Sequence, residues 1–151
     1  MPYGKLTKLL EQNHVPYAVI AHDPAYTASE TAESAHVPGY ELAKTVIVKV
    51  DGRLAMAVLP ATDSVHPEAL KRALGADTVT IAGEKDFADR FGECEIGAMP
   101  PFGELFGMDV YVTPRLALDE EICFNAGSHR ELVRMPYRDF ERLAHPVQVS
   151  F

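Results

Sequence analysis

The sequence predicts one α+β domain over residues 1–151, with a mixed, curved β-sheet and flanking helices. Three observations predict it. The length of 151 residues is the usual size of one domain with one continuous core. The 47% share of hydrophobic residues and 24% share of charged residues are ordinary for a folded globular protein. Strand-like segments, one hairpin among them, alternate with helical segments, and no repeat or interdomain linker interrupts them.

The first elements follow from apolar spacing and from a capping pattern. Leucines at helical spacing predict a helix over residues 6–13, and the apolar run at residues 17–20 predicts a strand. Thr27 and Glu30 have the spacing of a capping box, in which the two side chains satisfy free backbone donors at a helix start. A short helix is therefore predicted over residues 28–35.

The strongest local signal is a β-hairpin. Residues 45–50 and 53–59 are rich in strand-forming side chains and are joined by Asp51 and Gly52, a pair that favours a tight hairpin turn. Lys44 stands at the start of the first strand, so a rigid element would hold its ammonium group in place.

The second half of the chain continues the mixed pattern. Pro67 suits a first helical position and Gly75 a helix end. The remaining predicted elements are helices over residues 67–74, 84–91 and 137–143 and strands over residues 79–81, 108–113, 121–124 and 132–135.

The charge and the apolar runs limit the partners. A formal net charge of −8 opposes a large nucleic-acid surface and argues against DNA, but it allows a small, salt-sensitive contact. No apolar run approaches the roughly 20 residues of a spanning helix, and the N-terminus has no signal-peptide core. We therefore expect a cytoplasmic protein without a membrane partner. The candidate cations for a nucleic-acid contact are Lys44, Lys49, Arg53, Arg115, Arg130 and Arg134.

Several kinds of chemistry lack their motifs. Cys94 and Cys123 are too few for a disulfide framework, and Cys123 lies where a small buried hydrophobe is expected. The six histidines show no metal-ligand spacing, and nucleotide-binding glycine loops are absent, so neither a metal nor a cofactor is expected. Ser128 and His129 are adjacent and would point to opposite faces of an extended segment, which argues against a catalytic dyad.

Two glycine-rich segments are the best candidates for a site. Residues 97–103 (Gly-Ala-Met-Pro-Pro-Phe-Gly) and 124–129 (Phe-Asn-Ala-Gly-Ser-His) place glycine and proline where a chain turns beside a ligand. Glycine permits close approach and positive φ, and two prolines stiffen a turn and remove their own N–H groups. The remaining amides would suit a developing oxyanion. The alternative is a surface turn between two strands.

Together with the segment around Lys44, these residues resemble the YbaK and prolyl-tRNA synthetase associated domain family. Its members are free-standing relatives of the editing domain of bacterial prolyl-tRNA synthetases and hydrolyse mischarged aminoacyl-tRNA. The resemblance implies the same α+β architecture. Residues 98–100 depart from the small hydroxyl residues that relatives often carry, which bears on substrate choice. The matching segments are Tyr26 and Thr27, Lys44 and Thr45, the G-x-x-x-P loop at residues 97–101, Phe102 and Gly103, and residues 125–129.

The resemblance implies a deacylase that acts in trans on a small amino acid such as alanine or cysteine, including on tRNA-Pro. Its partners would be the acceptor end of aminoacyl-tRNA and a synthetase, and it would need no cofactor. Alternatives are a non-catalytic module that binds aminoacyl-tRNA or a synthetase, and hydrolysis of a small free ester or amide. The implied catalytic residues are Lys44, Gly97, Ala98, Met99 and Pro101. The implied substrate-binding residues are Tyr26, Thr27, Thr45, Phe102, Gly103, Asn125, Gly127, Ser128 and His129.

Overall fold

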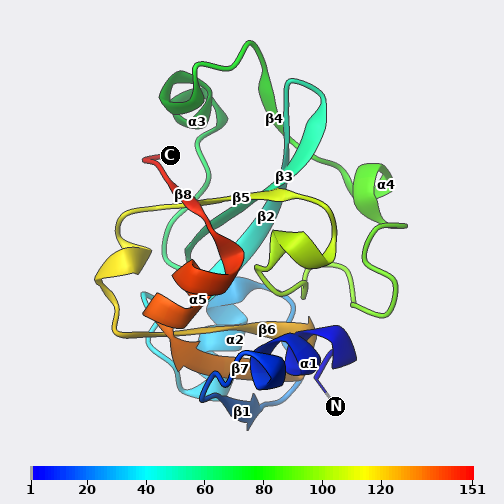
Figure 1. The fold of residues 1–151 in the computed structure, drawn as a ribbon, viewed down its shortest axis with the longest axis vertical. Coiled ribbons are helices and arrows are strands. Elements are labelled where there is room, and N and C mark those ends of the chain that lie inside the picture. Colours follow the sequence, from blue (N-terminus) through cyan, green and yellow to red (C-terminus); the bar gives the residue numbers. More distant parts are fainter. Residues whose placement is uncertain (1) are drawn as a thin grey trace.

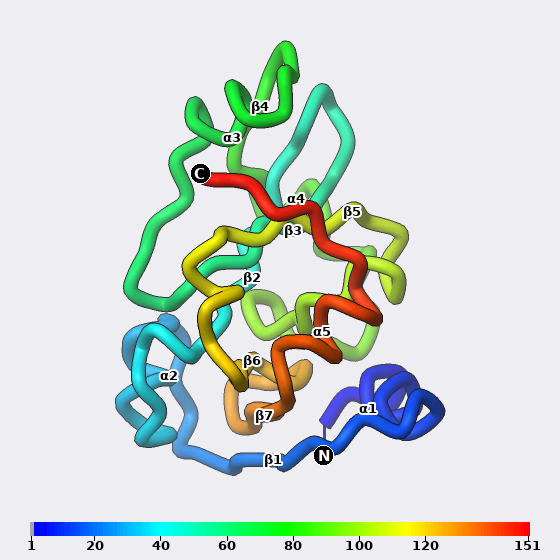
Figure 2. Tube along the Cα trace, turned by 60° about the vertical axis from the view of Figure 1, so that its left-hand side comes forward, coloured from blue at the N-terminus to red at the C-terminus, as the bar shows by residue number. Residues whose placement is uncertain are grey.

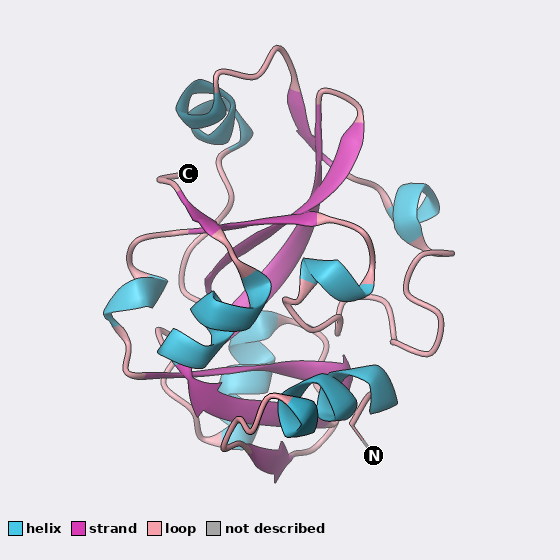
Figure 3. Cartoon of the chain, viewed as in Figure 1, coloured by secondary structure: helices cyan, strands magenta, loops and turns pink. Residues whose placement is uncertain are grey.

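Two β-sheets, rather than the single sheet expected, form the framework of the protein (Figures 1 and 3). The computed structural model describes residues 2–151. The strands are β1 (Ala18–Ala21), β2 (Ala43–Val50), β3 (Arg53–Pro60), β4 (Val79–Ile81), β5 (Asp109–Val112), β6 (Glu121–Ser128), β7 (Glu131–Pro136) and β8 (Val147–Gln148). The helices are α1 (Gly4–Gln12), α2 (Ala28–Ala35), α3 (Pro67–Leu74), α4 (Glu84–Phe87) and α5 (Tyr137–Ala144), with 3₁₀ turns at Gly103–Leu105 and Leu116–Leu118.

The smaller sheet is antiparallel, with strand order β1-β7-β6, and the larger is mixed, with order β4-β2-β3-β5-β8. An isolated parallel bridge between Leu42 and Cys123 joins them. Beyond this bridge β2 pairs with β3 over its whole length and β6 pairs with β7, and no further pairing between β2 and β6 is described within residues 2–151. The α+β class and a mixed sheet with flanking helices are therefore confirmed, and the chain forms two sheets where one was expected.

Most predicted elements are confirmed within a few residues, and the helix over residues 84–91 is the main error. That helix ends at Phe87, and turns follow. Phe87 and Phe91 are both buried and pack edge-to-face, with ring centroids 5.7 Å apart. Their shared burial, rather than a continuing helix, explains the helical spacing of the two aromatic residues. Strand β8 was not predicted, and β6 is longer than expected.

The Thr27 half of the predicted capping box of α2 is confirmed, whereas Glu30 bonds the Thr27 hydroxyl rather than a backbone N–H. Thr27 Oγ1 accepts a hydrogen bond from the Glu30 N–H at 3.1 Å and donates one to Glu30 Oε1 at 3.0 Å. Thr31 Oγ1 donates to the Thr27 carbonyl at 2.9 Å. These contacts explain Thr27 as a helix cap, and its expected contact with the substrate stays a prediction.

The small sheet lies between two helices, α1 and α2 (Figure 2). One face of β6 and β7 packs into the main core, where Phe102 contacts Phe124 and Phe140 at ring-centroid distances of 5.6 Å. The other face forms a smaller cluster with α2, which contains Leu42 and the fully buried Cys123. The burial expected for Cys123 is thereby confirmed. None of the helices within residues 2–151 has the length and apolar character needed to cross a bilayer.

Candidate active site

A tight turn forms the first half of the G-x-x-x-P segment. The Ala98 N–H donates to the Glu95 carbonyl at 3.0 Å, and Gly97, with a φ of +87°, occupies the third position of this turn. A type II turn requires positive φ there, which glycine adopts without strain. A β-carbon at Gly97 would also lie 3.3 Å from His129 Cε1. The backbone conformation therefore favours glycine, and the imidazole of His129 leaves little room for a side chain.

Gly127 ties this turn to strand β6. The Glu95 N–H donates to the Gly127 carbonyl at 2.8 Å, and the Gly127 N–H donates to the Ala98 carbonyl at 2.9 Å. Gly127 has a φ of +101° at an irregularity in β6 that follows Asn125. A β-carbon there would lie 2.7 Å from the Tyr3 β-carbon. The two glycine-rich segments singled out in the sequence are thus in direct contact, and the role of Gly127 is to hold the turn.

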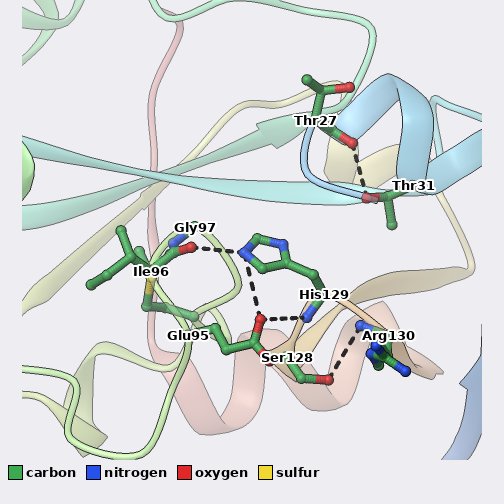
Figure 4. A network of polar contacts seen from close by, with 9 residues as sticks. Thr27, Thr31, Glu95, Ile96, Gly97, Ser128, His129 and Arg130 are labelled. Atoms are coloured by element: carbon green, nitrogen blue, oxygen red, sulfur yellow. Dashed lines mark hydrogen bonds and ion pairs between the residues drawn. The ribbon is translucent and has the colours of Figure 1, made fainter. Parts of the chain in front are cut away.

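His129 lies against the same turn (Figure 4). Its side chain is buried, and Nε2 donates to the Ile96 carbonyl at 2.8 Å, so in the neutral ring Nδ1 is an acceptor. The Tyr26 ring packs on the imidazole at 4.8 Å and remains 72% exposed. The Ala25 N–H donates to the His129 carbonyl at 3.2 Å, which brings the segment before α2 to the site.

The loop amides are mostly occupied. The Gly97 N–H donates to Met99 Sδ at 3.1 Å, and the Ala98 N–H closes the turn. Pro100 and Pro101 are buried and have no N–H. Within residues 2–151, no hydrogen bond is described for the Met99 N–H. The expectation that Gly97 and Ala98 supply free donors is therefore corrected, because the turn uses their amides for its own closure and packing.

Lys44 and Asn125 project from the same side of the neighbouring strands. Lys44 follows Leu42 by two residues, and Asn125 follows Cys123 by two residues. In an extended chain, side chains two residues apart lie on the same face. Leu42 and Cys123 belong to the cluster under α2, so Lys44 and Asn125 point to that side. Asn125 Oδ1 is buried and has no described hydrogen-bond partner.

The ammonium group of Lys44 is partly removed from water. Burial lowers the pKa of Lys44 below its ordinary value of 10.5, and the negative charge of Asp63 opposes this effect. A half-buried cation has a stronger field than a fully solvated one, because less water screens it. Lys44 therefore differs from an ordinary surface lysine.

Three predicted substrate-binding residues lie elsewhere. Thr45 occupies the opposite face of β2 from Lys44, and its Oγ1 is buried without a described partner. Phe102 is fully buried in the aromatic core. Gly103 packs against the Met108 carbonyl, which occupies the place that a β-carbon would take. These residues shape the core behind the loop, and the sequence could not show which side of the loop was buried.

Ser128 also has a local role. Its Oγ accepts a hydrogen bond from the Arg130 N–H at 3.3 Å, within the turn that joins β6 and β7. The predicted residues that remain candidates for contact with the substrate are Tyr26, Lys44, Asn125, the buried His129 and the backbone of the buried Met99.

Glu95 is a residue of the site that the sequence did not reveal. Its Oε2 accepts a hydrogen bond from the His129 N–H at 3.3 Å and lies 3.9 Å from His129 Nε2. The only available signal was its position two residues before Gly97, at the start of the turn, and no general pattern marks a carboxylate there.

The cavities described in the structure lie elsewhere. One of about 390 Å³ is lined by Asp119, Tyr137 and their neighbours, and another of about 350 Å³ is lined by residues of β5 and of the junction between α5 and β8. None of the five described cavities is lined by Lys44 or by residues 97–101. The candidate site is therefore defined by its hydrogen bonds and ring contacts rather than by one of these cavities.

The family match over residues 22–143 places the chain in the class of aminoacyl-tRNA editing proteins. Residues 22–143 match the aminoacyl-tRNA editing domain family, and the chain belongs to that family. The protein is thus an enzyme of the deacylase class, which hydrolyses the ester of aminoacyl-tRNA.

Known relatives agree with this assignment. The chain is 26% identical over 154 residues to the Multifunctional Ser/Thr-tRNA deacylase ProXp-y of Escherichia coli K12, an alignment that covers 99% of this chain and 92% of the relative. The same protein of Escherichia coli O157:H7 matches equally.

Two solved structures share the fold. A hypothetical protein aligns with a TM-score of 0.84 at 19% identity, over 97% of both chains. A protein assigned as a trans-editing enzyme for prolyl-tRNA synthetase aligns with a TM-score of 0.79 at 18% identity, over 97% of this chain and 93% of its own. At these identities the likeness concerns the fold, and it confirms the α+β class.

Proposed function

We propose that this protein hydrolyses the ester of mischarged tRNA in trans, and that Lys44, the Met99 N–H and His129 act on the substrate. The observation that supports this most is the docking of the 95–98 turn on Gly127 and His129, since it rigidifies the backbone just before the free Met99 amide. The acceptor end of tRNA is the proposed partner. A synthetase is a second proposed partner, because the structural relative noted above is assigned to prolyl-tRNA synthetase.

The proposed reaction needs charge stabilisation more than a protein nucleophile. Burial raises the pKa of Cys94 to about 11 and also raises that of Cys123, so both remain thiols at neutral pH and are poor nucleophiles. Water would attack the activated ester, and the family resemblance implies help from a ribose hydroxyl of the substrate. The Met99 N–H and the Lys44 ammonium would stabilise the oxyanion, and one such preorganised donor contributes on the order of 10²–10³ in rate.

For the amino acid, we propose serine and threonine ahead of alanine and cysteine. The curated relative acts on Ser/Thr-tRNA according to its name. The buried Asn125 Oδ1 lacks a partner in the described structure, and a substrate hydroxyl would satisfy it. A substrate without a hydroxyl would leave this buried oxygen unpaired, which lowers the catalytic efficiency for that substrate.

A single-turnover assay tests the proposed function. Purified protein in excess would be mixed with tRNA carrying labelled alanine, cysteine, serine, threonine or proline, at one salt concentration. We expect release of the labelled amino acid, fastest for serine or threonine. Saturable tRNA binding without ester loss on any substrate would refute the enzyme and favour the non-catalytic binding module.

Asn125→Ala should change selectivity. We expect deacylation of seryl-tRNA to fall about tenfold, since a hydrogen bond to the substrate hydroxyl is lost, while deacylation of alanyl-tRNA stays within about twofold. The ratio of kcat/KM for the two substrates measures the effect. Equal losses on both substrates would show that Asn125 does not read the hydroxyl.

A further inference from the structure

The side chain of Glu95 is fixed at one oxygen and open at the other. Oε2 contacts the His129 N–H and lies near Nε2, whereas no hydrogen bond is described for Oε1 within residues 2–151. Half of the side chain is exposed, at 50%. A carboxylate held in this way can accept a further hydrogen bond at Oε1 without being released from the protein.

The backbone of Glu95 is fixed as firmly as its side chain. Its N–H binds the Gly127 carbonyl, and its carbonyl closes the turn at Ala98. Glu95 is thus the first residue of the turn that leads to Met99, so the carboxylate belongs to the same rigid unit as the proposed oxyanion donor.

One atom of His129 links the carboxylate to the loop. His129 Nε2 lies 2.8 Å from the Ile96 carbonyl and 3.9 Å from Glu95 Oε2 (Figure 4). Within residues 2–151, no lysine or arginine is described in an ion pair with Glu95, and His129 is the only basic side chain described within 4 Å of its carboxylate. The carboxylate therefore presents a negative charge beside the loop.

The substrate of the proposed function carries the complementary charge. In an aminoacyl ester, the α-ammonium group is attached to the carbon next to the scissile carbonyl. A carboxylate beside the carbonyl site can bind this group through a charge-assisted hydrogen bond. An N-acylated aminoacyl-tRNA has a neutral amide at this position and cannot form that pair.

We propose that Glu95 is a specificity-determining residue that binds the α-ammonium group of the substrate, so that the enzyme accepts free aminoacyl-tRNA and rejects N-acylated forms. The inference rests on the proposed function. It does not require that Glu95 take part in bond cleavage.

The test compares the wild type with Glu95→Gln on seryl-tRNA and on N-acetylseryl-tRNA, each rate being divided by the uncatalysed rate. Glutamine keeps an acceptor for the His129 N–H and removes the charge. We expect the wild type to favour the free substrate about tenfold or more, and E95Q to lose that preference through a lower kcat/KM for seryl-tRNA only. Glu93→Gln, which removes an exposed carboxylate two residues away, should behave as the wild type on both substrates.

Equal losses by E95Q on the two substrates would assign Glu95 a merely structural role and overturn the inference, as would a wild type without preference. In both cases deacylation itself would persist, and the proposed function would stand. A wild type unable to deacylate any charged tRNA would overturn the proposed function, and the inference with it. Thermal unfolding of E95Q shows whether the variant is folded.

Discussion

Lys44→Met should lower the deacylation rate at least about tenfold and leave the protein folded. Methionine keeps most of the length of the side chain and removes only the ammonium group. At neutral pH the lysine is charged in both the folded and the unfolded state, and its burial disfavours the charged folded form. We therefore expect the melting temperature of K44M to equal or exceed that of the wild type, whereas the rate falls.

The pH dependence of stability checks the physical reason. Because the folded pKa of Lys44 lies below the unfolded value, the unfolded state binds more protons between the two, so this residue makes stability rise with pH there. The stability advantage of K44M should thus be complete below the lowered folded pKa and vanish above about pH 10.5. Urea unfolding of both proteins at several pH values measures it.

Lys49→Met is the matched control. Lys49 lies on the same strand, on the other face, and pairs with Asp86 at 2.9 Å. K49M removes one positive charge from β2, as K44M does. Lys49 was also a candidate cation in the sequence, but Asp86 compensates its charge in the structure, so we expect activity within about twofold of the wild type. Equal activity losses in K44M and K49M would show that the charge of the strand, not the position of Lys44, matters.

Gly97→Val should abolish most deacylation and destabilise the protein. Valine is strained at a φ of +87°, and its β-carbon would press on His129 Cε1 at 3.3 Å. We expect a loss in rate of about 10² or more, because the turn that positions the Met99 amide and the imidazole must shift. Strain of this kind costs about 1–3 kcal/mol in the free energy of unfolding.

Gly107→Val separates strain from site disruption. Gly107 has a φ of +70°, and a β-carbon there would meet no atom within 4 Å. The control should therefore lose stability as G97V does and keep most of its activity. If G107V lost activity to the same extent, general destabilisation would explain both variants, whereas an active G97V would remove residues 97–101 from the proposed mechanism.

Local chemistry predicted many of the elements and little of their assembly. The hairpin at Asp51-Gly52, the cap at Thr27 and the Pro67 to Gly75 helix were all predicted, because each is encoded by residues close in sequence. The prediction of a helix over residues 84–91 was wrong because its apolar spacing comes from contacts between residues that are distant in the sequence. There the spacing of Phe87 and Phe91 satisfies a distant aromatic core rather than a local helix.

The candidate site was likewise predicted only in part. The sequence pointed to the glycine turn, but could not show that its Gly97 N–H binds Met99 Sδ, or that Thr45 and Phe102 face the core. Those facts depend on how the loop and strand β2 pack against the core. Glu95 escaped notice because its role depends on His129, 34 positions away along the chain.

The sequence by itself determined the α+β class, the boundaries of most helices and strands and the two segments that meet at the site, because turns, caps and apolar periodicity act over a few residues. Only the tertiary structure decided that the strands separate into two sheets, which loop amide stays free and which carboxylate stands beside it. These depend on packing and hydrogen bonds between residues far apart in the chain, whose pairing no local pattern specifies.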